Sequence, residues 1–187
     1  GLGDLFDIAN RHARESQSIS VELIHSVVDA GQGVLSGEKT SDEQAYDVVI
    51  LPPNLTGARG QSDVAIHQFL RFQHALGTTL CSVCAGAFWL GHAGLLSGRP
   101  ATTHWALEEE FERSFSNIAL AVDRILIDDN DIITAGGVMA WLDLGLHLVG
   151  RYLGAEVVSK TARHLLVDTQ GREQKNYRTF RPALGHG

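Results

Sequence analysis

The amino-acid sequence predicts an α/β fold with a mainly parallel sheet and helices on both faces. Segments with strand-like and helix-like apolar spacing alternate along the chain, and no repeat or low-complexity tract interrupts them. The run Tyr46–Pro52 holds a continuous apolar block, as a parallel strand buried on both faces requires. With 187 residues, 44% of them hydrophobic, the chain is long enough for one domain with a sizeable core.

The first quarter of the chain is predicted to contain a helix and three extended segments. Apolar residues recur at helical spacing over Gly1–Arg14, which predicts a helix. Ser18–Val28 alternates roughly as a strand does, and a weaker extended piece, punctuated by glycines, follows it to Gly37. The strand Tyr46–Pro52 ends where Pro52 and Pro53 interrupt it.

A helix and a sharp strand-to-helix junction come next. Ser62 or Asp63 caps a helix that ends before Gly77. Thr78–Val83 is a short apolar strand, and Cys84–Ala93 turns helical without loop residues between the two.

The remaining chain is predicted to form an amphipathic helix, a β-hairpin, two further helices and a tail. These segments are Trp105–Phe115, then Val122–Ile127 with Asp131–Thr134, then a helix from Gly136 to about Gly154, and a helix over about Ala155–Val167. Residues Asp128, Asp129 and Asn130 are expected to form the hairpin turn. Residues 1–168 are therefore interpreted as one domain, and residues 169–187, which lose all periodicity, as a linker.

Composition and charge exclude several classes of function. The formal net charge of −7 makes the domain itself a poor binder of nucleic acid. The chain has no membrane-length apolar run and no signal-peptide pattern, so we expect a cytoplasmic protein without membrane contact. Two cysteines are too few for a disulfide framework, and the nine histidines show no zinc-binding spacing, so no metal site or cofactor is expected.

Cys84 is the main candidate for chemistry. The segment Thr79–Ala87 passes from strand to helix through this cysteine, and the small residues Ala85 and Gly86 follow it, as in a nucleophile elbow. A thiol at a helix N-terminus meets free N–H groups that favour the thiolate. The alternative, a buried cysteine acting as a small hydrophobe, carries equal weight for Cys84 and is favoured for Cys81. A redox pair of the two is disfavoured, because three strand steps separate their Cα atoms by about 10 Å.

Two other segments could contribute to a site. His104 closes a short extended segment before a helix, from which its imidazole could reach Cys84 and activate the thiol. From the residues alone, a capping or packing histidine is the favoured alternative. The helix that starts at Gly136 and Gly137 could bind an anion or approach a ligand closely, although it lacks a dinucleotide fingerprint.

Three stretches of sequence resemble the ThiJ/PfpI superfamily, a branch of the class I glutamine amidotransferase-like folds. They are Leu51-Pro52, SVCAGAFWLGHAGLLSGRPATTHW from Ser82 to Trp105, and DIITAGGVMAWLDLGLHLV from Asp131 to Val149. The sequence is still more similar to the amidotransferase-like sensor domain at the N-terminus of some AraC/XylS transcriptional regulators, whose tail resembles the segment from Thr161 to Gly187. The resemblance implies a flavodoxin-like three-layer sandwich.

By this resemblance, the function expected is that of a ligand- or redox-sensing domain that controls a helix-turn-helix DNA-binding module following residue 187. Its effector would be an unidentified small molecule, and its assembly a homodimer. Cys84 matches the family's elbow cysteine, and His104 the histidine that approaches it. The expected pocket, at the carboxyl edge of the sheet, comprises Asn54, Cys84, Ala85, His104, Trp105, Gly136 and Gly137.

The alternative is a stand-alone cysteine-dependent hydrolase or hydratase of the same superfamily. Two departures from the family pattern make a non-enzymatic sensor the preferred interpretation. The family's acidic partner of the cysteine, and its first strand, are expected upstream of Gly1. Pro53 has no N–H to offer an oxyanion, although Asn54 could supply one.

Overall fold

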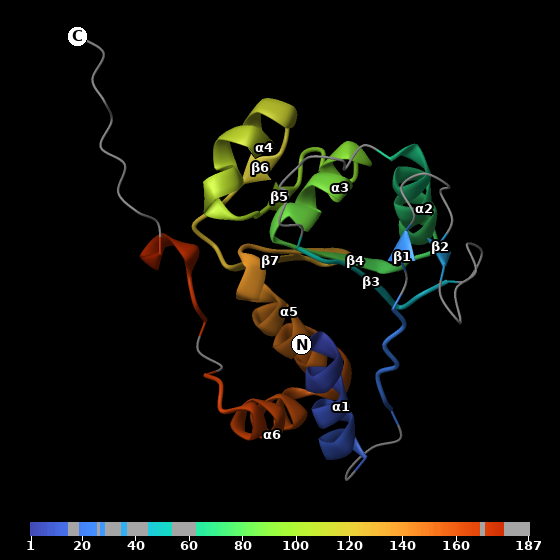
Figure 1. The fold of residues 1–187 in the computed structure, drawn as a ribbon, viewed down its shortest axis with the longest axis vertical. Helices are drawn as coiled ribbons and strands as arrows, with labels where there is room; N and C mark the ends of the chain where they lie inside the picture. Colours follow the sequence, from blue (N-terminus) through green and yellow to red (C-terminus); the bar gives the residue numbers. More distant parts are fainter. Residues whose placement is uncertain are drawn as a thin grey trace.

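A four-stranded sheet forms the middle layer of the protein (Figure 1). The computed structural model describes residues 1–14, 19–25, 27–28, 35–36, 45–53, 63–168 and 171–177. The strand order is β3 (Val48–Leu51), β4 (Thr79–Val83), β8 (Ile132–Ala135) and β7 (Leu126–Asp129). The first three strands are parallel, and β7 is antiparallel to β8. The predicted α/β class with a mainly parallel sheet is confirmed.

Helices cover both faces of this sheet (Figure 1). One face carries α1 (Leu2–Ala13), α5 (Trp141–Leu153) and α6 (Ala155–Leu165), and the other carries α2 (Val64–Ala75), α3 (Ala87–His92) and α4 (Glu108–Ser114). The short 3-10 helices are η1 (Cys84–Gly86), η2 (Trp105–Leu107), η3 (Val138–Ala140) and η4 (Gln174–Asn176). Two small sheets pair β1 (Val27–Val28) with β2 (Leu35–Ser36), and β5 (Pro100–Ala101) with β6 (Ala119–Leu120). None of the described helices has the length and apolar character needed to cross a bilayer.

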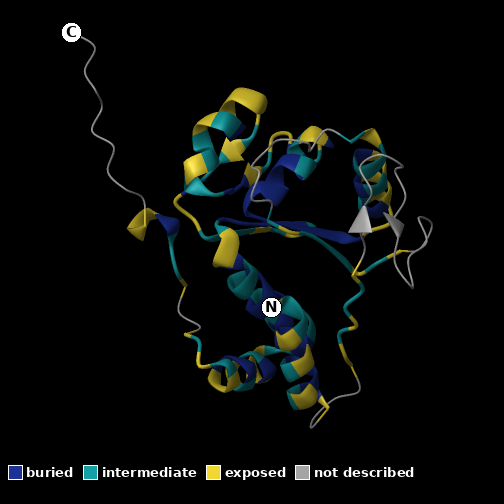
Figure 2. Cartoon of the chain, in the orientation of Figure 1, coloured by how far each residue is buried: buried dark blue, intermediate teal, exposed yellow. Residues whose placement is uncertain are grey.

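The core consists of two apolar layers, one on each face of the sheet (Figure 2). Strand β4 is buried along its whole length and contributes to both layers, because successive strand residues point to opposite faces. Leu80 joins the layer under α2 and α3 together with Phe88. Cys81 joins the layer under α1 and α5 together with Leu144. Burial on both sides fixes the height and direction of β4, and therefore the place where Cys84 emerges from it.

The strand predicted over Ser18–Val28 is wrong for most of its length. Of the residues in this range that the structure describes, only Val27 and Val28 form a strand, and residues 19–25 lie outside any sheet. The side chain of Asn10 explains the difference, because its Nδ2 donates to the Val21 carbonyl and its Oδ1 accepts the Val21 N–H, both at 2.7 Å. This side chain satisfies backbone groups that a neighbouring strand would otherwise pair.

The predicted β-hairpin is present, but its turn lies further along the chain. Strand β7 continues through Asp129, which pairs with Ile132, so Asn130 and Asp131 form the two-residue turn. Asn130 has a φ of 66°, a left-handed conformation that asparagine tolerates better than most residues.

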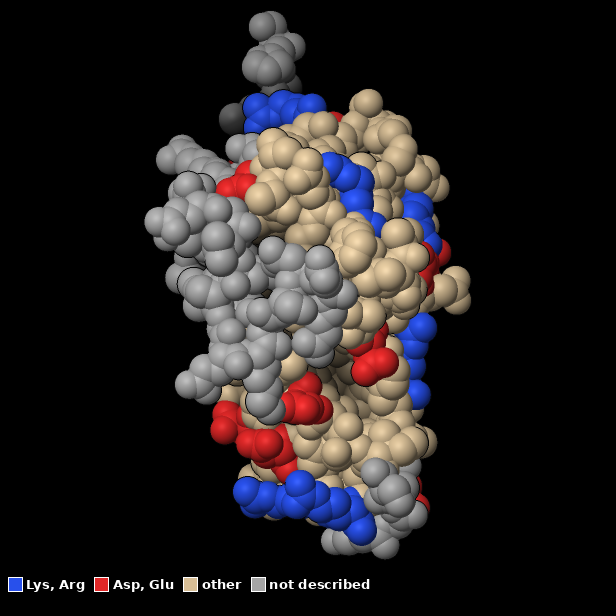
Figure 3. Space-filling view, turned by 90° about the vertical axis from the view of Figure 1, so that its right-hand side faces the viewer, with Lys and Arg blue, Asp and Glu red and all other residues tan. Residues whose placement is uncertain are grey.

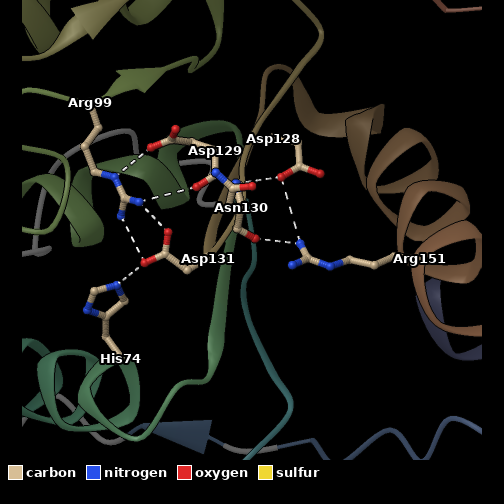
Figure 4. Close-up of polar contacts among 7 residues, drawn as sticks. All are labelled: His74, Arg99, Asp128, Asp129, Asn130, Asp131 and Arg151. Carbon is tan, nitrogen blue, oxygen red and sulfur yellow. Dashed lines mark hydrogen bonds and ion pairs between the residues drawn. The ribbon is translucent and has the colours of Figure 1, made fainter.

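The acidic side chains around this turn are held by arginine and histidine side chains from the neighbouring elements (Figure 4). Arg99 Nε donates to Asp129 Oδ2 at 2.6 Å, and the same guanidinium binds both carboxylate oxygens of Asp131. His74 Nε2 lies 2.6 Å from Asp131 Oδ2. The hydrogen bonds from Arg99 lower the pKa of Asp131 to about 2.

We expect Asp131→Asn to destabilise the protein at pH 7 by about 1 kcal/mol, with a smaller effect in acid. A carboxyl whose pKa falls on folding stabilises the native state above its unfolded value, and this contribution is lost as the pH falls toward 2. The side chain is 43% exposed, so solvent screening keeps the effect small. Urea unfolding at pH 7 and pH 2.5 measures it, with the exposed Asp7→Asn as control. An equal loss at both pH values would contradict the prediction.

Candidate functional site

The sharp junction after β4 places Cys84 at the carboxyl edge of the sheet. Cys84 has a φ of 57°, in the left-handed region that residues with a Cβ rarely adopt. Such backbone strain persists only where the surroundings impose it, and it is concentrated at functional sites. Helix α3 begins directly after η1, so the cysteine lies at the entrance to a helical segment, as an elbow requires.

The small residues after Cys84 are needed because η1 packs directly on the end of β3. A Cβ at Gly86 would lie 2.7 Å from the Leu51 carbonyl oxygen and 3.0 Å from that of Pro52. Ala85 is completely buried. The close approach of backbone to backbone therefore leaves room for glycine alone at position 86 and fixes the elbow against β3.

The surroundings of the Cys84 thiol favour its neutral form. Burial raises the pKa of Cys84 and outweighs the backbone N–H groups of Ala85 and Gly137, which act in the opposite direction. Only 5% of the residue is exposed. The N–H groups expected at a helix start are thus present, but desolvation opposes the thiolate more strongly than they favour it.

The segment Thr102–Trp105 lies beside the elbow. Thr103 Oγ1 donates to the Cys84 carbonyl oxygen at 2.9 Å and ties the two segments together. His104 caps η2, where its Nδ1 accepts the Ala106 N–H at 3.0 Å. Burial lowers the pKa of His104, which favours a neutral imidazole. Both His104 and Cys84 are within the described chain, and no hydrogen bond joins their side chains.

Gly136 and Gly137 complete this edge of the sheet. Gly137 has a φ of 88° and precedes η3, and its N–H is directed at Cys84. A Cβ at Gly137 would lie 4.0 Å from Cδ2 of His104, so the imidazole lies directly beside this glycine. Gly136 has no room for a side chain, because a Cβ there would lie 2.7 Å from the Thr103 carbonyl oxygen and would also overlap Gln174.

The structure thus brings Cys84, Ala85, His104, Gly136 and Gly137 to one edge of the sheet. Trp105 is next to them, with its ring centroid 5.4 Å from that of His104. Asn54, the remaining residue of the predicted pocket, lies outside the described residues.

Sequence reasoning missed two residues of this region, Thr103 and Gln174. Gln174 belongs to the predicted linker 169–187, yet it is 3% exposed and contacts Thr103. No periodic pattern marks a single buried residue in a tail, so the sequence held no signal for Gln174. Thr103 lay within a motif that was identified, but its hydroxyl contact depends on the fold.

Cys81 takes no part in the site. It is fully buried in β4, where its register partners are Ile50 and Ile133, and burial raises its pKa to about 12. In the described part of the chain, no group of three or more His, Cys, Asp or Glu residues is placed to hold a metal ion.

Residues 8–151 match the DJ-1/PfpI family. The chain belongs to this family. The resemblance to ThiJ/PfpI proteins, seen first in the residues around Cys84 and Gly136, is thereby confirmed.

Among the relatives of this DJ-1/PfpI domain are a regulator and an enzyme. It is 32% identical over 110 residues to the HTH-type transcriptional regulator GbdR of Pseudomonas aeruginosa, covering 59% of this chain and 30% of the regulator. It is 33% identical over 115 residues to isonitrile hydratase of Pseudomonas putida, covering 62% of this chain and 49% of the enzyme. The matches thus span half or less of these relatives.

The fold is also that of an AraC family transcriptional regulator structure from Pseudomonas putida. The TM-score is 0.62 at 17% identity, over 87% of this chain and 91% of the other.

We expect the Cys84 thiol of this DJ-1/PfpI domain to be alkylated with a pH half-point above the roughly 8.5 of a free cysteine. The reason is the burial that raises its pKa. His104→Ala is not expected to raise the half-point, since no hydrogen bond joins the imidazole to the thiol. Iodoacetamide labelling with mass-spectrometric detection measures both. A half-point below 8.5 that rises in the variant would show an activated Cys–His pair.

Proposed function

We propose that this chain is the ligand- or redox-sensing domain of an AraC-type transcriptional regulator. The observation that supports this best is the similarity to GbdR and to an AraC family structure, combined with a site in which burial raises the pKa of the Cys84 thiol and no hydrogen bond joins it to His104. Such a site would bind or sense a small molecule without needing a turnover step. The pocket would lie around Cys84, His104 and Gly137.

DNA binding would belong to a helix-turn-helix module elsewhere in the full-length protein. The net charge of −7 opposes phosphate binding by this domain. On the face shown in Figure 3, the described Lys and Arg side chains stand in separate places and form no continuous basic surface. We further propose that the regulator acts in the cytoplasm as a homodimer, because pairing of two sensor domains would let an effector change how two DNA-binding modules are spaced.

The test uses the full-length protein. We expect it to bind discrete promoter sites, mapped by crosslinking and sequencing, and we expect residues 1–168 alone to bind none. Cys84→Ala and His104→Ala should change transcription from these promoters at least about fivefold, whereas Glu109→Gln on exposed α4 should not. A full-length protein that binds no specific DNA would refute the regulator function.

The second candidate is a cysteine-dependent hydratase or hydrolase. The strained φ of Cys84 and the similarity to isonitrile hydratase favour it. Incubation of the protein with an isonitrile would then consume the substrate, and Cys84→Ala would abolish that consumption. A rate equal in the two proteins would exclude this activity.

A further inference from the structure

Residues 171–177, here called the tail latch, pack against the candidate site. In Figure 1 this red segment lies at the level of the sheet, away from α6. Glu173 forms an antiparallel bridge with Arg124, and its Oε2 accepts the Ile125 N–H at 3.3 Å. Arg172 binds the carboxylate of Asp143 on α5. The latch is therefore attached both to the chain entering β7 and to the helix that follows Gly137.

The side chain of Gln174 is the centre of this attachment. Its amide nitrogen donates to the carbonyl oxygens of Thr103 and Arg124, both at 2.9 Å, and to Thr102 Oγ1 at 3.2 Å. Its Oε1 accepts the Trp105 N–H at 3.1 Å. The two residues on either side of His104 thus both bind Gln174, so the position of the imidazole depends on this amide.

Two hydrogen bonds connect the latch to the cysteine. Gln174 binds the Thr103 carbonyl, and the Thr103 hydroxyl binds the Cys84 carbonyl. The backbone at Gly136 packs tightly against Gln174, because even a Cβ there would overlap the Gln174 amide. The segment 102–105 cannot shift away from Cys84 without breaking bonds to a buried amide, and a buried amide left without partners is costly.

We propose that the tail latch senses the state of the site, with Gln174 as the positioning residue. A ligand or adduct bound at Cys84 displaces the segment 102–105, which the Thr103 hydroxyl ties to the Cys84 carbonyl, and so breaks the Gln174 bonds and frees residues 171–177. Conversely, an undocked latch loosens His104 and admits water to the thiol. The biological role of this coupling rests on the proposed function, because the tail latch leads into the chain after Tyr177. The coupling itself is a property of the domain.

The experiment uses residues 1–187 and the adduct formed by iodoacetamide on Cys84. Hydrogen exchange of residues 174–177 is compared before and after alkylation, and we expect about tenfold faster exchange in the adduct. The reverse direction uses Gln174→Ala, which should speed exchange in the latch and lower the pH half-point of Cys84 alkylation by about half a unit, because water entry reduces desolvation. Lys175→Ala, an exposed change in the same segment, is the matched control and should do neither.

The outcomes separate coupling from simple attachment. If Gln174→Ala frees the latch but leaves the alkylation half-point unchanged, Gln174 only fastens the tail and the proposal is wrong. If alkylation leaves exchange in residues 174–177 unchanged, it is also wrong. Neither readout involves DNA, so a positive result stands even where the full-length protein binds no promoter, and a negative result leaves the regulator function open to its own test.

Discussion

Replacing Phe88 by alanine is expected to lower the free energy of unfolding by about 4 kcal/mol. Phe88 lies on α3, four residues after Cys84, and is completely buried. Its ring packs edge-on against Phe111 of α4 with centroids 4.9 Å apart, and contacts Phe115 at 5.8 Å. Alanine would leave a cavity between α3, α4 and the sheet that rigid neighbours could only partly fill.

Urea unfolding of Phe88→Ala measures this loss, and Phe88→Leu is the control. Leucine retains most of the apolar volume, so we expect it to cost less than about 1.5 kcal/mol. Because α3 continues from the elbow, we also expect Phe88→Ala to increase the alkylation rate of Cys84. An alanine variant as stable as the leucine variant would mean that the aromatic cluster contributes little to the core.

Replacing Gly86 by alanine is expected to cost about 3 kcal/mol by overpacking. The backbone of Gly86 has a φ of −54°, which alanine adopts readily, so the cost is purely steric. The added Cβ meets the carbonyl oxygens of Leu51 and Pro52, and neither can rotate away as a flexible side chain would. The end of β3 must therefore separate from η1.

Gly3→Ala is the matched control for this substitution. Gly3 lies in α1, where a Cβ would lie 3.7 Å from Cδ2 of Leu23, an ordinary contact. We expect this change to be neutral or to stabilise the protein by up to about 1 kcal/mol, because alanine is the better helix former. Equal effects of the two substitutions on the urea midpoint would contradict the close approach at Gly86.

The parallel sheet and its helices were predictable because their apolar patterns are local. The block within Tyr46–Pro52 and the junction at Cys84 each carry their signal within a few residues. The strand predicted over Ser18–Val28 failed for another reason, because the Asn10 side chain of α1 takes the place of a neighbouring strand at Val21, and apolar spacing does not show such a side-chain contact. The small pair of β5 and β6 was missed because two-residue strands have no periodicity to detect.

The candidate site was predicted to the extent that its residues sit at ends of predicted elements. Cys84 and Gly137 follow β4 and β8, so their meeting at one edge follows from parallel topology. The state of the thiol did not follow from sequence, because the balance between helix-start N–H groups and burial depends on how tightly the surroundings close. The docking of Gln174 could not be predicted from the sequence either, because its partners come from several segments that only the fold brings together.

The register of β4 has a consequence for the order in which the protein forms. Leu80 pairs with Ile132, and α3, β5, α4 and β6 all lie between these two residues in the sequence. The β7–β8 hairpin, by contrast, joins neighbouring segments. Such long-range parallel pairing forms slowly, because closing the long loop costs chain entropy before the contacts between the strands can compensate for it. A growing chain therefore carries Cys84 long before it carries Gly137 and Gln174. We therefore expect the thiol to stay accessible to solvent until the segments that carry Gly137 and Gln174 have docked, so that its accessibility reports the completion of the domain.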